Sequence, residues 1–300
     1  MASPAQNRRG IVFMLSAMLL FIGNDTLMKL ARETYPVGQA IAVRTIFAAA
    51  TGLAMVFLLG EGRKLAMAFD RRVLARALVE SAVALSFIWS LGLLPIANIT
   101  AIVMTSPIII VVLAVLLGIE RIGWRRGVAI LVAFAGVLVV VRPGPEGFSI
   151  AALVALASAV LVGVRDLLTR SIGSQVPSTV ISLTTTVVVG VVALGLGLFE
   201  TWVPVWRIET TYLALAAVLV SIGSIFIVSA FRDTDLGVVS GFRYSVVVFA
   251  VVMGWLVWGE VPDGPALAGI ALIVGSGLYT MHRTRVRPDS NLKIAGGPPA

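Results

Sequence analysis

The stretch GNDTLMKLARETYP, residues 23–36, has a counterpart in VRDLLTRSIGSQVP, residues 164–177. At an offset of 141 positions the two stretches share an acid, a base and a proline: Asp25 aligns with Asp166, Lys29 with Arg170, and Pro36 with Pro177. Near the end of each half, Glu120 in GIERIGW aligns with Glu260 in WGEVPDG at an offset of 140. Matches at one nearly constant offset indicate two copies of one unit.

The composition excludes an ordinary soluble domain. Hydrophobic residues make up 59% of the 300 residues and charged residues only 13%, whereas soluble domains carry about 25% charged residues. Apolar runs recur along the whole chain, and a helix of about 20 such residues spans a bilayer. Because alternating strand patterns are absent, the backbone must be satisfied within helices.

Apolar runs between charged, proline or glycine breaks predict ten membrane-spanning helices. Their expected ranges are 10–31, 36–59, 73–94, 96–117, 123–141, 148–168, 177–199, 210–230, 236–258 and 264–282. Each copy therefore holds five helices, and because five is odd the second copy enters the membrane from the opposite side. The predicted fold is an all-α polytopic membrane protein whose ten transmembrane helices form two inverted five-helix repeats.

These ranges also divide the chain into segments. The expected segments are a cytoplasmic N-terminus at 1–9, a first repeat at 10–141, an outer linker at 142–147, a second repeat at 148–282 and a disordered basic cytoplasmic tail at 283–300. Arg8 and Arg9 precede an apolar stretch, but no A-x-A-like cleavage site follows. We therefore expect the first span to be retained rather than removed as a signal peptide.

Basic residues predict the orientation. With the N-terminus placed in the cytoplasm, 17 Lys and Arg residues fall on the inner side and 4 on the outer side, and cytoplasmic loops retain excess basic residues. We therefore expect a multi-pass protein of the bacterial inner membrane with both termini in the cytoplasm. Because the basic residues lie in short loops, the net charge of +8 does not indicate nucleic-acid binding.

Several motifs resemble a known family. They are "ND...K" in the first span (Asn24, Asp25 and Lys29), "YPVGQ....R" from Tyr35 to Arg44, and Gly-Ile-Glu or Trp-Gly-Glu closing the fourth span of each half. Together with the repeat they are similar to the EamA-type branch of the drug/metabolite transporter superfamily, over about residues 9–282. The resemblance implies small organic solutes that move by alternating access through a central cavity lined mainly by helices 3, 4, 8 and 9.

The family includes importers of cofactor-like molecules such as riboflavin or S-adenosylmethionine, and exporters of amino acids and metabolites. The first-helix motifs resemble the importer-like bacterial members most. Import of a cofactor-like solute is therefore implied, export of amino acids or related metabolites is the alternative, and an intramembrane enzyme or a receptor is a remote one. Two positions depart from the repeat, because Thr185 aligns with Arg44 and Val103 aligns with Arg243.

Ionisable groups at the centre of a span cost about 2.5 to 3.5 kcal/mol each, so each needs a partner, a watery cavity or an interface. Glu80, followed on the third span by Trp89, either lines the solute pathway or a proton relay, or reaches the inner interface. Arg243, with Ser240 and Tyr244 on the ninth span, is either a contact for an anionic or planar solute or the structural partner of an acid such as Glu80.

Charges also lie toward the outer end of the first two spans. Arg44 has no charged neighbour at helical spacing on its own helix, so its partner must come from another one, and Asp25 lies at a similar depth. An Arg44–Asp25 pair is either an outer gate or a structural clamp. Lys29 is four residues from Asp25, so the two either pair with each other or turn into the bundle toward Arg44. Asp166 is the repeat counterpart of Asp25.

The fourth span is unusually polar and contains a proline. Asn98, Thr105 and Pro107 predict a kinkable helix that either lines the pore or binds other helices through small polar residues. Glu120 and Glu260 stand at helix ends next to loops, where they are either interfacial caps or binding groups.

Other function classes lack their residues. The chain has no cysteine and one histidine, His282, so no metal site is expected. No G-x-x-x-x-G-K-[ST] loop is present, which disfavours ATP hydrolysis. Asp25 and Asp166 are expected on opposite sides of the membrane, so they cannot share a proton as an aspartic dyad would. We expect no enzymatic activity and no cofactor; the expected partners are a small-molecule substrate and the lipid bilayer, and a homodimer is left open.

Overall fold

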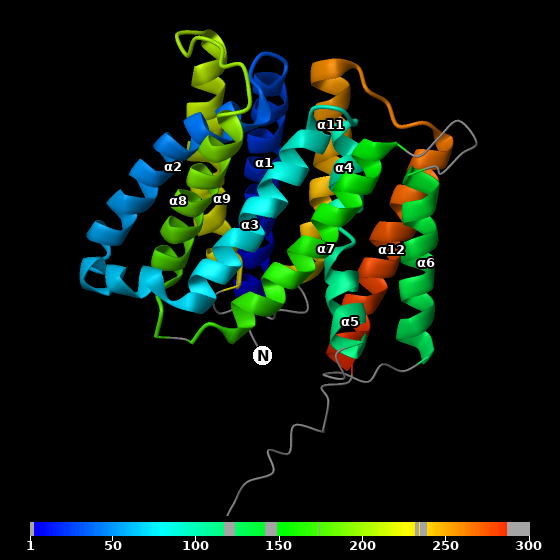
Figure 1. Ribbon diagram of the computed structural model, residues 1–300. Coiled ribbons are helices and arrows are strands. Elements are labelled where there is room, and N and C mark those ends of the chain that lie inside the picture. The colour runs from blue at the N-terminus through cyan, green and yellow to red at the C-terminus, as the bar shows by residue number, and fades with distance from the viewer. Residues whose placement is uncertain are drawn as a thin grey trace, which may run out of the picture.

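The computed structural model describes residues 3–116, 124–141, 149–173, 175–231, 234 and 239–286. Within these residues every regular element is a helix (Figure 1). The elements are α1 (Pro4–Arg32), α2 (Val37–Leu58), η1 (Gly62–Phe69), α3 (Arg71–Leu91), α4 (Ile96–Val103), α5 (Ser106–Leu116), α6 (Trp124–Val141), α7 (Ile150–Ser171), α8 (Ser178–Gly197), α9 (Ile208–Phe231), η2 (Ser240–Tyr244), α11 (Ser245–Trp258) and α12 (Gly264–Val286). The all-helical prediction is therefore confirmed.

Each predicted span coincides with helix, but the ends differ. The first helix starts at Pro4 rather than at residue 10, because Ser3 and Gln6 form a capping box that stabilises an earlier start. The last helix continues to residue 286, so the first part of the predicted tail is helical. The short 3-10 helix η1 occupies a segment that the sequence predicted as a loop. The predicted outer linker at 142–147, the end of the tail and Glu120 lie outside the described residues.

Length and composition place these helices in a membrane. Within the described ranges, seven helices are long and apolar enough to cross a bilayer, and three shorter apolar segments at 96–110, 127–140 and 264–279 accompany them. Large apolar side chains such as Leu58 and Phe199 are 84% and 89% exposed, which suits contact with lipid tails and not with water. The protein is a multi-pass membrane protein.

The fourth predicted span is broken into two helices. α4 ends at Val103, and a turn separates it from α5, although the sequence predicted one helix over 96–117. Pro107 explains the position of the break, because its ring would clash with the carbonyl four residues earlier, which belongs to Val103. Within the break, Thr105 Oγ1 donates a hydrogen bond of 2.6 Å to a carbonyl of the last turn of α4.

The ninth predicted span, 236–258, is interrupted as well. Its described part starts with the 3-10 helix η2, which changes into the α-helix α11 at Ser245. At an offset of 140 positions Ser245 aligns with Thr105, so both halves change their helix geometry at an equivalent place. Interrupted helices are tolerated at membrane depth only where they are buried in protein or line a watery space.

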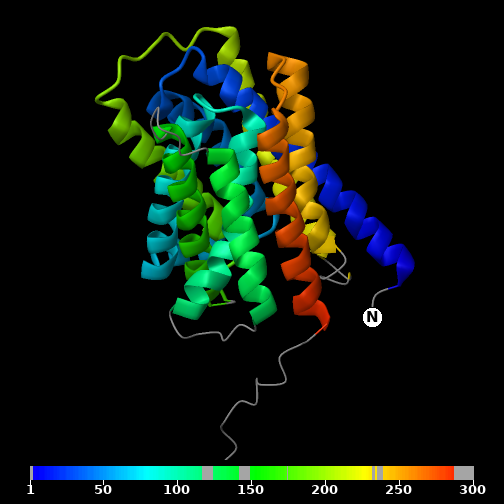
Figure 2. The ribbon, with the colours of Figure 1, turned by 90° about the vertical axis from the view of Figure 1, so that its right-hand side faces the viewer.

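The helix contacts are symmetric between the two halves: where two helices pack together, their counterparts in the opposite halves also pack together (Figures 1 and 2). α1 packs on α9, while α7, the counterpart of α1, packs on α3, the counterpart of α9. α2 packs on its own counterpart α8, and α6 lies beside its own counterpart α12 in both views. The start of α1 and the end of α12 lie at the lower edge of Figure 1, which we call the termini side; the opposite edge is the distal side.

The α6–α12 contact depends on two glycines. A Cβ added at Gly136 would lie 2.8 Å from the Gly269 carbonyl oxygen, and a Cβ added at Gly269 would lie 2.8 Å from the Gly136 carbonyl oxygen. Only residues without a side chain allow backbones to approach this closely, as small residues do at membrane helix crossings. The two helices therefore contact each other through backbone atoms at the point where they cross.

Candidate functional site

One polar group lies where α1 faces α2; we call Asn24, Asp25 and Arg44 the α1 cluster. Asn24 bridges the two charges, because its Nδ2 donates to Asp25 Oδ1 at 2.8 Å and its Oδ1 accepts from Arg44 Nη1 at 3.3 Å. The charge of Arg44 also interacts with those of Asp25 and Glu80. The predicted Arg44–Asp25 contact thus exists indirectly, through an amide between the two side chains.

A second group joins α3 to α7; we call Glu80, Arg165 and Asp166 the α7 cluster. Arg165 Nη1 donates to Glu80 Oε2 at 3.0 Å, and its Nη2 and Nε donate to Asp166 Oδ1 at 2.7 and 2.9 Å. The Arg165 and Glu80 side chains are 21% and 23% exposed, so this pair is largely removed from solvent. Glu80 therefore pairs with Arg165, and not with Arg243 as one alternative from the sequence held.

The two clusters are built from equivalent positions. Asn24 and Asp25 align with Arg165 and Asp166 at the offset of 141. In each pair the first residue donates to the carboxylate of the second and reaches a neighbouring helix with its remaining polar atoms. The sequence reasoning counted Arg165 among the cytoplasmic loop residues; its place immediately before Asp166, as Asn24 precedes Asp25, is the signal that would have found it.

Arg76 compensates for the arginine that the second half lacks. Thr185 occupies the repeat position of Arg44, and Arg76 of α3 donates to Thr185 Oγ1 at 2.7 Å from its Nη1. Its Nε donates to Thr169 Oγ1 of α7 at 2.9 Å. A guanidinium therefore stands beside the α7 cluster, as the Arg44 guanidinium stands beside Asn24 in the α1 cluster, although it comes from a helix that is not the counterpart of α2.

Lys29 belongs to a third group, at the distal side. Its ammonium forms a 2.7 Å ion pair with Glu260, donates to the Leu94 carbonyl at 3.0 Å and lies 4.5 Å from the Trp258 ring centroid. Glu260 also accepts a hydrogen bond of 3.2 Å from the Ile96 amide at the start of α4. Lys29 is thus paired with Glu260 instead of Asp25, and Glu260 is both a helix cap and an ion-pair partner.

Two further glutamates, which the sequence reasoning missed, bind the starts of equivalent helices in opposite halves. Glu200 accepts from the Gly38 and Gln39 amides, at 3.0 and 3.2 Å, at the start of α2. Glu61 accepts from the Thr179 hydroxyl at the start of α8. Each acid follows the second helix of its own half and binds the start of the second helix of the other half, where carboxylates are favourable.

The other predicted residues are more scattered. Asn98 Oδ1 is buried on α4 without a hydrogen-bond partner in the described part of the chain. Tyr244 contacts α12, where its hydroxyl occupies the space that a side chain at Gly277 would fill. Trp89 packs against the hydrophobic core. The side chain of Ser240 lies outside the described atoms.

Arg243 is half-buried on η2, close to the α7 cluster. Its charge interacts with those of Asp166 and Arg165, yet among the described residues it forms no hydrogen bond and no ion pair. Arg165 already occupies the carboxylates of both Glu80 and Asp166. The guanidinium of Arg243 is therefore available to a ligand.

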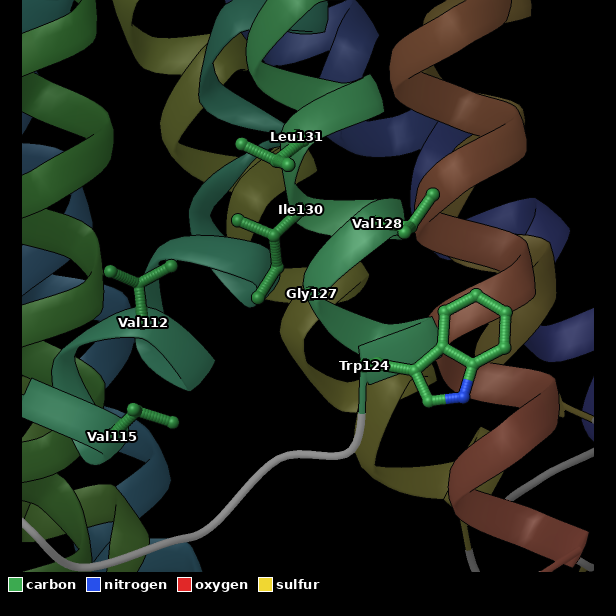
Figure 3. A pocket seen from close by; sticks show the side chains of 7 residues that line it. All are labelled: Val112, Val115, Trp124, Gly127, Val128, Ile130 and Leu131. Carbon is green, nitrogen blue, oxygen red and sulfur yellow. The ribbon is translucent and has the colours of Figure 1, made fainter.

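Surface grooves lie elsewhere. A groove of about 430 Å³ lies between α5 and α6. Figure 3 shows the residues that line it: Val112, Val115, Trp124, Gly127, Val128, Ile130 and Leu131. A second groove of about 390 Å³ lies between α6 and α12. Neither contains a member of the polar clusters. The lining of the first groove is almost wholly apolar, which suits lipid chains better than a polar solute.

The comparisons with known proteins agree with this architecture. The chain is 30% identical over 240 residues to a riboflavin transporter of Rhizobium johnstonii, covering 77% of this chain and 78% of that protein. It is 26% identical over 272 residues to the pseudopaline exporter CntI of Pseudomonas aeruginosa, covering 89% and 94%, and 26% identical over 200 residues to an S-adenosylmethionine uptake transporter of Rickettsia conorii, covering 66% and 67%.

A family profile matches the chain twice, at residues 8–142 and 149–281. The two matches together cover most of the chain and lie on either side of the boundary between the halves. The relatives are transporters and not enzymes. The chain belongs to the EamA-like transporter family.

Proposed function

We propose that this protein is a secondary transporter that moves a small organic metabolite by alternating access. The observation that carries the proposal is the pair of charged clusters on α1 and α7, at equivalent positions of the two halves. Charges within membrane helices are costly and mark solute or ion pathways. In transporters built from inverted repeats, the solute site lies at the interface of the repeats.

The proposed architecture has ten membrane spans in two inverted five-helix repeats, at about residues 10–141 and 148–282. Seven long and three shorter apolar segments within the described residues supply ten candidates. The reciprocal helix contacts, the reciprocal glutamate contacts at the starts of α2 and α8, and the two interrupted helices support the symmetry. The start of α1 and the end of α12 lie on the same side in Figure 1, which agrees with an even number of crossings.

The proposed location is the bacterial inner membrane, with both termini in the cytoplasm. Support comes from the sequence, in which 17 Lys and Arg residues fall on the inner side and 4 on the outer side; with Arg165 placed in the α7 cluster, the inner count becomes 16. The termini side of Figure 1 is then cytoplasmic and the distal side external. The homodimer remains a prediction.

In this arrangement the Lys29 group closes the external side. The Lys29–Glu260 pair and the Glu260–Ile96 hydrogen bond join α1, the end of α11 and the start of α4. Opening the external side requires these contacts to separate. We assign the gating role to Lys29 and Glu260, and assign Asp25 and Arg44, bridged by Asn24, to the pathway beneath them.

Coupling to protons is assigned to Asp25 and not to Glu80. Glu80 binds the Arg165 guanidinium at 3.0 Å, so a proton could join this carboxylate only by breaking a salt bridge. Asp25 accepts a hydrogen bond only from the neutral Asn24 amide among the described residues. Asp25 can therefore exchange a proton without breaking a salt bridge.

For the solute, we favour import of a cofactor-like molecule of the riboflavin or S-adenosylmethionine class. The riboflavin and S-adenosylmethionine transporters among the relatives support this direction. Export of amino acids or related metabolites is the second candidate, because the pseudopaline exporter aligns over 89% of the chain.

Reconstitution into proteoliposomes tests the proposal. Uptake of riboflavin, S-adenosylmethionine and an amino-acid mixture is measured with and without a proton gradient. We expect saturable flux of one solute class, slowed by Asp25→Asn and preserved in Arg207→Gln, which alters an exposed loop arginine. Protein that binds a solute but moves none in either direction would refute the transporter assignment, and flux unaffected by an uncoupler and by external pH would refute the role of Asp25.

A further inference from the structure

The charges around the two clusters do not balance. One set of interacting side chains runs from α1 to η2, and it contains three carboxylates and four guanidiniums: Asp25, Glu80 and Asp166 with Arg44, Arg76, Arg165 and Arg243. With every group in its ordinary ionised form, the set has one positive charge in excess. The excess has to be met by something other than these seven side chains.

The contacts show which arginine is in excess. Arg165 binds both carboxylates of the α7 cluster, and Arg44 reaches Asp25 through Asn24. Arg76 donates to two threonine hydroxyls, so its guanidinium has hydrogen-bond acceptors. In the described part of the chain, Arg243 is the one arginine of this set that has neither a hydrogen-bond acceptor nor an ion-pair partner.

We propose that the transported solute carries an anionic group, a carboxylate or a phosphate, and that Arg243 binds this group. The inference rests on the proposed transport function and adds the chemical class of the solute. A guanidinium presents paired N–H donors that match two oxygens of a carboxylate or phosphate. A solute without such a group would leave the excess charge unpaired within the membrane-crossing part of the protein, which is costly. Of the two molecules named above, S-adenosylmethionine carries a carboxylate, whereas riboflavin carries neither group.

The surroundings of Arg243 suit such a ligand. Arg243 lies on η2 two residues before Ser245, where α11 begins, and the Ser245 hydroxyl is buried without a hydrogen-bond partner in the described chain. Asn98 on α4, which packs against α11, carries another buried polar atom without a partner. Unpaired buried polar atoms are rare in native proteins, and a polar ligand would supply their partners.

Stability of the ligand-free protein provides the first test. Removing a paired guanidinium leaves its partner acids uncompensated, whereas removing an unpaired one relieves a cost. We therefore expect Arg165→Gln to lower the thermal unfolding midpoint in detergent, and Arg243→Gln to leave it unchanged or raise it. If Arg243→Gln lowers the midpoint as far as Arg165→Gln does, Arg243 has a structural partner and the proposal is wrong.

Anion binding provides the second test. Chloride is replaced by acetate or by inorganic phosphate at constant ionic strength, and the unfolding midpoint is followed as a function of anion concentration. At least one of the two should stabilise wild type and Arg207→Gln alike, with its apparent affinity about tenfold or more weaker in Arg243→Gln, the loss expected for a charge-assisted bond. No stabilisation by either anion, or equal stabilisation in Arg243→Gln, would overturn the proposal. Because these measurements need no flux, failure of transport with anion binding intact would refute only the proposed function.

Discussion

Removing the Glu260 carboxylate should open the distal side of the protein. Glu260 forms a 2.7 Å ion pair with Lys29, which also donates to the Leu94 carbonyl and lies over Trp258. In Glu260→Gln the side chain keeps an oxygen that can accept from the Ile96 amide but loses the charge that holds Lys29. The substitution therefore weakens the contact between α1 and α11 while leaving the cap of α4 largely in place.

The magnitude follows from burial. Exposed ion pairs are worth about 1 kcal/mol or less, and breaking a buried pair costs about 3 to 5 kcal/mol. The Lys29 and Glu260 side chains are 9% and 27% exposed, so we place this pair between the two limits, at about 2 kcal/mol. If the pair exists only in the distally closed state, its loss raises the open-to-closed ratio by about 30-fold.

The absence of cysteine from the chain makes a direct assay possible. Ala97 lies on α4 next to Ile96 and is 2% exposed, so a cysteine there reports on opening of the distal side. Its labelling by a membrane-impermeant maleimide should be up to about 30-fold faster in the Glu260→Gln background. Arg207→Gln, which also removes a distal charge, should leave the rate of Ala97→Cys unchanged.

A change of less than about twofold in labelling would show that the pair does not bias the distal opening. A double-mutant cycle with Lys29→Met and Glu260→Gln separates the two side chains. A coupling energy below about 0.5 kcal/mol would refute the reasoning, because the distance and burial would then not translate into stabilisation of the closed state.

Three further predictions concern stability, measured by thermal unfolding in detergent. Glu80→Gln should destabilise by about 2 to 4 kcal/mol, and adding Arg165→Gln should restore part of the loss, because the pair is mostly removed from solvent. Glu200→Ala should cost about 1 kcal/mol, because two amides at the start of α2 lose their acceptor. Gly269→Leu should cost about 2 kcal/mol or more by forcing α12 away from α6, whereas Gly275→Leu on the same helix, with open space at its Cβ position, should be tolerated.

Each of these has a result that would contradict it. If the Glu80→Gln/Arg165→Gln double variant is no more stable than Glu80→Gln alone, the two side chains act independently. An unchanged midpoint in Glu200→Ala would show that water replaces the carboxylate at the helix start. Equal losses in the two glycine variants would indicate a general effect of leucine on α12 and not the close backbone approach.

Much of the architecture could be predicted from the residues alone. Every span predicted from an apolar run contains helix in the structure. Apolar runs are informative because the fixed thickness of the bilayer sets the length of each helix that crosses it. Pro107 predicted a weak point in the fourth span, and the structure places the break four residues before it, at Val103. The second break has no proline, so only the coordinates located the change at Ser245.

The site was harder to predict, because ion pairs depend on which helices meet. Lys29 and Asp25 are four residues apart on one helix, yet Lys29 pairs with Glu260, which is 231 positions away. The sequence predicted Arg165 as a cytoplasmic loop residue, whereas in the structure it forms ion pairs with both acids of the α7 cluster. Lys29 thus pairs with a residue that packing brings close and not with its neighbour on the same helix, and Arg165 joins its neighbour Asp166 to Glu80, which is 85 positions away.

The sequence by itself determined that this is a membrane protein made of two related halves, because both conclusions depend on local composition and on a repeated spacing, which folding does not alter. Tertiary structure alone decided which charge meets which, where the helices break in the second half, and that Arg243 has no acid of its own within the described chain. The physical reason is that a salt bridge forms over a few ångströms, while its two residues can lie anywhere along the chain.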